Sequence, residues 1–226
     1  MNAVSRPAVC ECCGASPHVG PCSSVGLELL PGDCVFFQSD GFVAWAIRQV
    51  ERWHFWRRCG LLLSCRFRES FAELEARSYV NHVAMVVEGG SLMTARIMDA
   101  QPPVVHSRRL GMYVDDLVAV YRPNGIDDDT RRAMAKRALR YEGRPYGVGK
   151  IVLHALGMQG LSFIDRWPMC AWTYGIPAEE VGIRTSEEGA RAAAPDSQWD
   201  WMRKHLGRPD EPGTFTCVRP LSILEA

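Results

Sequence analysis

Three residues of this 226-residue chain have the side chains needed for nucleophilic catalysis by a thiol: Cys170, His82 and Asp99. A cysteine nucleophile needs a base that forms the thiolate, a group that orients the base, and donors for the developing oxyanion. Pro168 precedes Cys170 and a helical pattern follows, so we expect the thiol at a helix N-terminus, which lowers thiol pKa and offers free backbone N–H groups. His82 lies in the most strand-like segment. Asp99 ends the next expected strand, where its carboxylate is suited to accept a hydrogen bond from the far ring nitrogen of His82.

The same three residue types have common structural roles. A cysteine in a protein interior usually behaves as a small hydrophobic residue. A histidine on an apolar strand is often a hydrogen-bonded core residue, and an aspartate at a strand end often forms a turn. The residues alone therefore leave two interpretations open, a catalytic triad or three structural side chains.

A strand-rich middle region is expected to position these residues. Residues 79–87 (YVNHVAMVV) are rich in β-branched side chains and precede Gly89 and Gly90, which predicts a buried strand. Residues 92–99 are expected to form its antiparallel neighbour. Further short strands are predicted over residues 27–30, 34–37, 104–108 and 117–122.

Helical patterns flank these strands. Apolar residues recur at helical spacing over 42–56, and three aspartates precede a predicted helix over 130–141, as the helix dipole favours. Further helices are expected over 150–156, after Cys170 within 170–183, and over 195–206, with Asp196 or Ser197 as possible caps. The tail after Pro209 is expected to be a loop and a short apolar end. The order predicts an α+β fold in which an antiparallel sheet packs against helices.

Composition limits the classes of protein that fit. The 26 basic and 26 acidic residues give a formal net charge of zero, which argues against nucleic-acid binding through bulk electrostatics. The 47% hydrophobic and 23% charged content is typical of a globular chain. The length predicts one domain, over residues 27–226, with a Cys-rich N-terminal appendage over residues 1–26.

No secretory signal and no apolar run near the roughly 18 residues of a membrane span are visible, so we expect no transmembrane segment and a cytoplasmic location with free thiols. Release by a non-classical route is the alternative that the sequence leaves open. Cys10, Cys13, His18 and Cys22 resemble a zinc knuckle with one residue missing. The alternative, which the missing residue favours, is a tail that merely contains cysteines. No metal or other cofactor is expected in the site around Cys170.

Several short motifs appear in a distinctive order: GDCVF at 32–36, NHVAMVV at 81–87, IMDA at 97–100, YEGRPY at 141–146, and then Cys170. This order resembles the circularly permuted papain-like amidases of the NlpC type, the YaeF/YiiX group. The resemblance spans roughly residues 27–185. It implies a papain-like core, in which a helix carrying the cysteine packs on an antiparallel sheet carrying the histidine, and the permutation accounts for the order His, acid, Cys.

Carried over to this chain, the resemblance makes Cys170 the nucleophile, His82 the general base and acid, and Asp99 the orienting group. Tyr146, Trp172 and Asn81 would line the substrate site. The chain has Asn81 where the family has Ser, Asp99 where it usually has Glu, and Ala-Trp after the cysteine where it has Ser-Glu.

The resulting prediction is a cysteine hydrolase, similar to a cysteine peptidase or amidase, that cleaves an amide bond in a peptidoglycan-type peptide or a related acyl substrate. Two alternatives remain open. One is a catalytically silent binding or regulatory protein on the same fold, which the Trp172 departure motivates. The other is a lipid acyl hydrolase or acyltransferase. The sequence predicts no oligomeric state.

Overall fold

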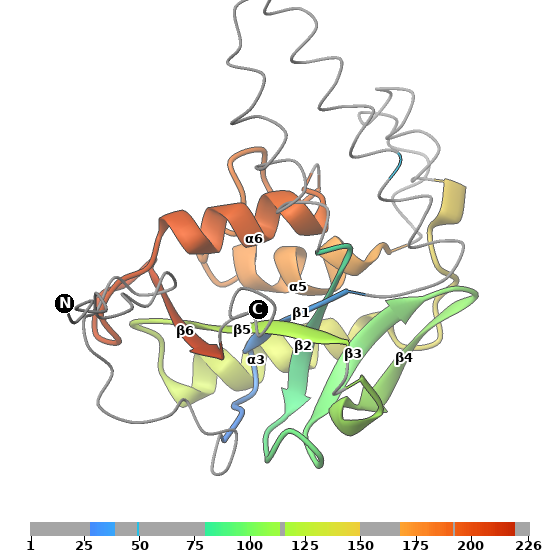
Figure 1. Ribbon diagram of the computed structural model, residues 1–226, viewed down its shortest axis with the longest axis horizontal. Coiled ribbons are helices and arrows are strands. Elements are labelled where there is room, and N and C mark those ends of the chain that lie inside the picture. The colour runs from blue at the N-terminus through green and yellow to red at the C-terminus, as the bar shows by residue number, and fades with distance from the viewer. Residues whose placement is uncertain are drawn as a thin grey trace, which may run out of the picture.

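The computed structural model describes residues 28–38, 49, 80–113, 116–149, 168–191 and 193–219 (Figure 1). Within these ranges, six strands form one antiparallel sheet in the order β4-β3-β2-β1-β5-β6. The strands are β1 (Cys34–Phe37), β2 (His82–Glu88), β3 (Arg96–Gln101), β4 (Val104–Arg109), β5 (Leu117–Pro123) and β6 (Phe215–Arg219). Strand β1 is central because it pairs with both β2 and β5.

The α-helices in the described ranges are α3 (Asp128–Ala138), α5 (Cys170–Glu179) and α6 (Pro195–Lys204). Two 3-10 turns, η1 (Leu110–Tyr113) and η2 (Leu139–Tyr141), follow β4 and α3. Asp127 is the N-cap of α3, and its carboxylate accepts a hydrogen bond from the Thr130 N–H at 2.8 Å. The mixed architecture confirms the α+β prediction. Figure 1 shows α5 and α6 together above the sheet.

Both faces of the sheet are buried. Alternate residues of β2 enter two different hydrophobic clusters, as the two-residue period of a strand requires. Val83, Met85 and Val87 belong to the cluster that also contains residues of α3, α5 and α6, including Cys170. Ala84 and Val86 belong to the second cluster, with Phe37. The buried strand predicted over residues 79–87 is therefore confirmed from His82 onward, which gives His82 and its neighbours a rigid support.

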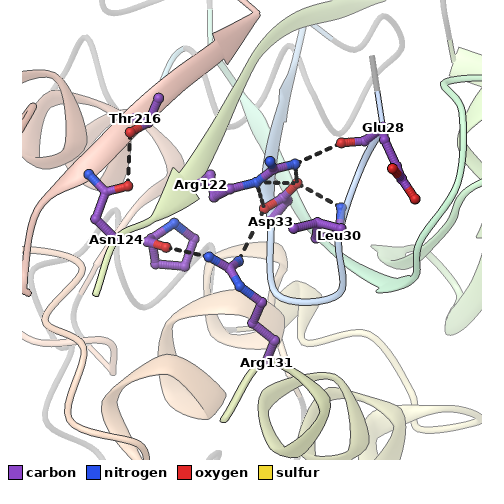
Figure 2. Close-up of polar contacts among 8 residues, drawn as sticks. Glu28, Leu30, Asp33, Arg122, Asn124, Arg131 and Thr216 are labelled. Carbon is purple, nitrogen blue, oxygen red and sulfur yellow. Dashed lines mark hydrogen bonds and ion pairs between the residues drawn. The ribbon is translucent and has the colours of Figure 1, made fainter. Parts of the chain in front are cut away.

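A buried carboxylate anchors the turn before β1 (Figure 2). Asp33 is fully buried and receives three hydrogen bonds from Arg122 of β5, from Nε at 3.0 and 3.3 Å and from Nη2 at 2.8 Å. Arg131 of α3 lies 3.5 Å away, and the Leu30 N–H donates at 2.9 Å. Asp33 thus ties the entry of the central strand to β5 and α3, and a buried charge with this many partners is satisfied.

The N-terminal strand pieces differ from the prediction. The strand expected over 27–30 is absent from residues 28–30, where only an isolated bridge joins Leu29 to Gly90. The strand expected over 92–99 begins later, at Arg96. The N–H of Ala95 donates to the carbonyl of Ser91 at 2.9 Å, so the first residues form a turn after β2 instead of continuing a ladder.

The C-terminal region contains a strand that sequence reasoning missed. Residues after Pro209 were expected to form a loop and an apolar end, but β6 pairs with β5 at the edge of the sheet. The cap predicted for the last helix was also wrong. Ala194 is the N-cap of α6, and Ser197 lies one turn inside, where its hydroxyl accepts the Ala194 N–H at 3.0 Å. A serine three residues into a helix can satisfy the cap backbone in this way.

Apart from residue 49, the predicted helix over 42–56 lies outside the described residues, as do the predicted helix over 150–156 and the Cys-rich segment 1–26. Among the described residues, no helix has the length and apolar character to cross a membrane. The described residues also contain no group of three or more His, Cys, Asp or Glu side chains that could hold a metal ion.

Candidate active site

His82 and Asp99 meet at the start of β2. His82 is the first residue of that strand, and Asp99 lies in the neighbouring antiparallel strand β3. The Nε2 atom of His82 is 2.7 Å from Oδ1 of Asp99, and both side chains are buried. The hydrogen bond predicted between them is present, so the carboxylate fixes which ring nitrogen carries a proton toward it.

Cys170 completes the group from the helical layer. It is the first residue of α5, with Met169 as the N-cap, as the preceding proline predicted. Cys170 interacts with His82, whose pKa it raises. Because Nε2 of His82 is occupied by Asp99, Nδ1 is the nitrogen left for the thiol. The structure therefore brings together the three residues that the sequence singled out, from β2, β3 and the N-terminus of α5.

The electrostatics of the group favour a protonated imidazole. Burial alone lowers the pKa of His82, but the hydrogen bonds with Asp99 and Cys170 and their negative charges raise that pKa to about 10. Burial raises the pKa of Asp99, and the opposing effects of His82, Tyr113 and Arg108 bring it below the ordinary value. A cationic imidazole next to the Asp99 carboxylate and Cys170 is the consequence at neutral pH.

A second pair of residues holds the other oxygen of Asp99. The hydroxyl of Tyr113 donates to Oδ2 at 2.7 Å, and Arg108 donates to the Tyr113 oxygen at 3.1 Å. The Nε atom of Arg108 is 3.8 Å from the same carboxylate oxygen. Sequence reasoning missed both residues. The sequence signal for Tyr113 was weak. It is a tyrosine in the connection after β4, and β4 pairs with β3, the strand that carries Asp99.

The ring of Phe37 packs against both His82 and Tyr113. Its centroid is 5.7 Å from that of His82 and 5.6 Å from that of Tyr113. Phe37 and His82 are also partners in the ladder between β1 and β2. The imidazole thus has an aromatic neighbour as well as a carboxylate, and this contact also escaped sequence reasoning.

Tyr146 lies beside the thiol. Its hydroxyl is 4.0 Å from Sγ of Cys170, and its side chain is buried. Burial, followed by the charge of Cys170, raises its pKa well above the ordinary value, while a hydrogen bond from the Cys170 backbone acts in the opposite direction. The backbone N–H of Tyr146 donates to Pro103 at 2.9 Å, and that of Gly147 to Pro168 at 3.0 Å, which fixes this segment between the β3–β4 hairpin and the start of α5.

The two other residues predicted to line the site are also buried. The indole Nε1 of Trp172 donates to the Arg191 carbonyl at 3.1 Å, and the Arg191 guanidinium lies 5.7 Å from the centre of its ring. Asn81 precedes His82 and donates its backbone N–H to Phe37 at 3.2 Å. The role of both residues toward a substrate stays a prediction.

No protein-family model matches the chain, and no curated protein sequence matches it. The resemblance to permuted papain-like amidases therefore stays a prediction that depends on the motifs quoted above.

Proposed function

We propose that this protein is a cysteine hydrolase with a permuted papain-like core, in which Cys170 is the nucleophile, His82 the general base and acid, and Asp99 the orienting group. The observation that carries the proposal is the position of His82, whose imidazole bonds the Asp99 carboxylate at 2.7 Å and whose pKa is also raised by Cys170. A nucleophile, a base and an orienting group in this linear arrangement are the requirements of thiol catalysis.

In the proposed reaction, His82 holds the proton of Cys170, and the resulting thiolate attacks the carbonyl carbon of an amide while the carbonyl π electrons move to oxygen. As the tetrahedral intermediate collapses, the C–N bond breaks and His82 donates its proton to the leaving amine. A water molecule then attacks the thioester while His82 takes a proton from it. The C–S bond then breaks, the carboxylic acid leaves, and the Cys170 thiolate and the protonated His82 are restored.

Donors for the oxyanion are expected at the start of α5. The first N–H groups of a helix have no acceptor within the helix, and Cys170 occupies the first helical position. The hydroxyl of Tyr146, 4.0 Å from the sulfur, is a second candidate donor. Both would act on the negative oxygen that forms only in the transition state.

The substrate class follows from the resemblance, which implies amide bonds of peptidoglycan-type peptides or related acyl groups. A specific observation keeps a second function in view: Cys170 is 1% and His82 6% exposed. A substrate carbonyl needs an approach to the sulfur, so this burial favours a silent binding or regulatory protein as the alternative.

Alkylation of the intact protein by iodoacetamide, followed by peptide mapping, separates the two functions. Hydrolase chemistry predicts that buried Cys170 reacts faster than the more exposed Cys217, because thiolate content, not exposure alone, sets the rate. His82→Gln should slow the reaction at Cys170 by about tenfold or more, whereas Cys217→Ser should leave it unchanged.

A chromogenic ester then tests turnover. The proposal predicts a burst of p-nitrophenol from p-nitrophenyl acetate, equal to one acyl group per Cys170 and absent in Cys170→Ser. Equal or slower alkylation of Cys170 relative to Cys217, unaffected by His82→Gln and without a burst, would overturn the hydrolase and favour the silent protein.

A further inference from the structure

We propose that Tyr113 is a positioning residue of this site, which holds the Asp99 carboxylate in the orientation that His82 requires. The inference rests on the proposed function for its catalytic meaning, but the geometry that supports it is independent of any reaction. The hydroxyl of Tyr113 donates to Oδ2 of Asp99 at 2.7 Å, while Oδ1 bonds His82 at the same distance.

Two anchored oxygens define the plane of a carboxylate. A single hydrogen bond to His82 would leave Asp99 free to rotate about its terminal torsion, because that torsion is broad in the absence of other contacts. Arg108, whose Nε lies 3.8 Å from Oδ2, would attract the carboxylate during such a rotation. Tyr113 links Arg108 to Asp99. Its oxygen accepts a hydrogen bond from Arg108 at 3.1 Å, and its hydroxyl donates a hydrogen bond to Asp99.

The proton of Tyr113 remains available for this role over a wide pH range. Burial, and the hydrogen bond and charge of Asp99, raise the pKa of Tyr113 to about 12, although Arg108 acts in the opposite direction. A phenol that loses its proton beside a carboxylate would place two anions together, which is unfavourable. Tyr113 is therefore a donor to Asp99 at every pH at which the site would work.

Tyr113 also supports the imidazole through its ring. Its ring contacts Phe37, and the ring of Phe37 contacts His82 in turn. One residue of the η1 turn thus constrains both partners of the His82–Asp99 hydrogen bond, one through its hydroxyl and the other through an aromatic neighbour. These two functions can be separated, because Tyr113→Phe removes the hydroxyl and keeps the ring.

The proton on Nε2 of His82 reports the orientation of Asp99 directly in a proton NMR spectrum, because a proton shared with a carboxylate at 2.7 Å is strongly deshielded and exchanges slowly. We expect Tyr113→Phe to shift this resonance upfield and speed its exchange with water, and to move the pKa of His82 down from about 10. Tyr141→Phe is the matched control, since it removes a phenol whose ring lies against Arg144, and it should change neither.

The reactivity of Cys170 provides the second readout. Loss of a hydrogen bond to a charged group that orients a catalytic side chain predicts an alkylation rate about tenfold lower in Tyr113→Phe. Arg108→Met should produce a smaller change in the same direction, because it leaves the bond from Tyr113 to Asp99 in place. Circular dichroism of each variant verifies that the fold is retained.

The two proposals fail in different ways. A wild-type protein with an unreactive Cys170 overturns the hydrolase, and the His82 resonance in Tyr113→Phe still decides the role of Tyr113. If Cys170 reacts in a His82-dependent manner, yet Tyr113→Phe leaves the resonance, the His82 pKa and the rate at wild-type values, the positioning role is wrong and the hydrolase stands.

Discussion

His82 donates from Nε2 to Oδ1 of Asp99 at 2.7 Å across the pair of strands β2 and β3, with both side chains buried. A carboxylate and an imidazole in this arrangement stabilise each other's charged form, which raises the pKa of His82 and lowers that of Asp99. The contact determines both the protonation of the site and part of the stability of the fold, and several measurements follow from it.

Asp99→Asn should bring the pKa of His82 down from about 10 toward its ordinary value of 6.5, because the amide keeps the shape of the carboxylate without its charge. NMR titration of the histidine ring signals measures the change, with the His82 signal assigned from the His82→Gln variant. Asp129→Asn is the control, since its carboxylate is 89% exposed and pairs only with Arg132 within one turn of α3. A His82 pKa that stays near 10 in Asp99→Asn would contradict this view of the site.

The stability of the protein should depend on pH through His82. The folded-state pKa of His82 is raised, so the folded protein binds more protons than the unfolded chain between about pH 6.5 and 10. This contribution is complete below pH 6.5 and is lost as pH rises, at a maximum of about 1.4 kcal/mol per pH unit. Urea unfolding of the wild type and His82→Gln across this range gives the difference. A constant difference between the two proteins would show that His82 has an ordinary pKa.

Asp33→Ala should lower the free energy of unfolding by about 3–5 kcal/mol, because it leaves Arg122 and Arg131 near a buried site without their carboxylate. Burial already lowers the pKa of Arg131, an effect that Asp33 opposes. Urea denaturation with circular dichroism detection provides the value. Asp129→Ala, which breaks an exposed pair, should leave the unfolding midpoint unchanged, and equal losses in the two variants would rule out a special role for Asp33.

Tyr174→Phe should leave the free energy of unfolding unchanged or raise it by up to about 1 kcal/mol. Its hydroxyl is buried and has no hydrogen-bond partner among the described residues, so its removal ends an unfavourable desolvation. Burial, with Cys34 and Asp33 nearby, raises the pKa of this phenol well above its ordinary value. Thermal and urea unfolding check the expectation. A loss of more than about 1 kcal/mol would reveal a hydrogen bond made by this hydroxyl.

Local sequence patterns were enough to predict much of the fold. The β-branched run around His82 predicted a buried strand, and the aspartates before α3 predicted its start, because strand burial and helix capping depend on residues close in sequence. Strand β6 was missed because it has only five residues after a glycine-containing loop, too few to show a clear alternation of apolar and polar side chains. Its pairing with β5 is a long-range contact that supplies the missing hydrogen bonds.

The sequence by itself determined the types of the site residues and the local structures that bear them: a histidine on a buried strand, an aspartate on the next strand, and a cysteine at the start of a helix. Only the tertiary structure decided which side chains pair with the buried charged groups. Tyr113 holds Asp99, and Asp33 meets Arg122 and Arg131 across separations of 89 and 98 residues. The physical reason is that strand order and register choose which side chains meet, and these depend on pairing across the whole sheet instead of on neighbouring residues.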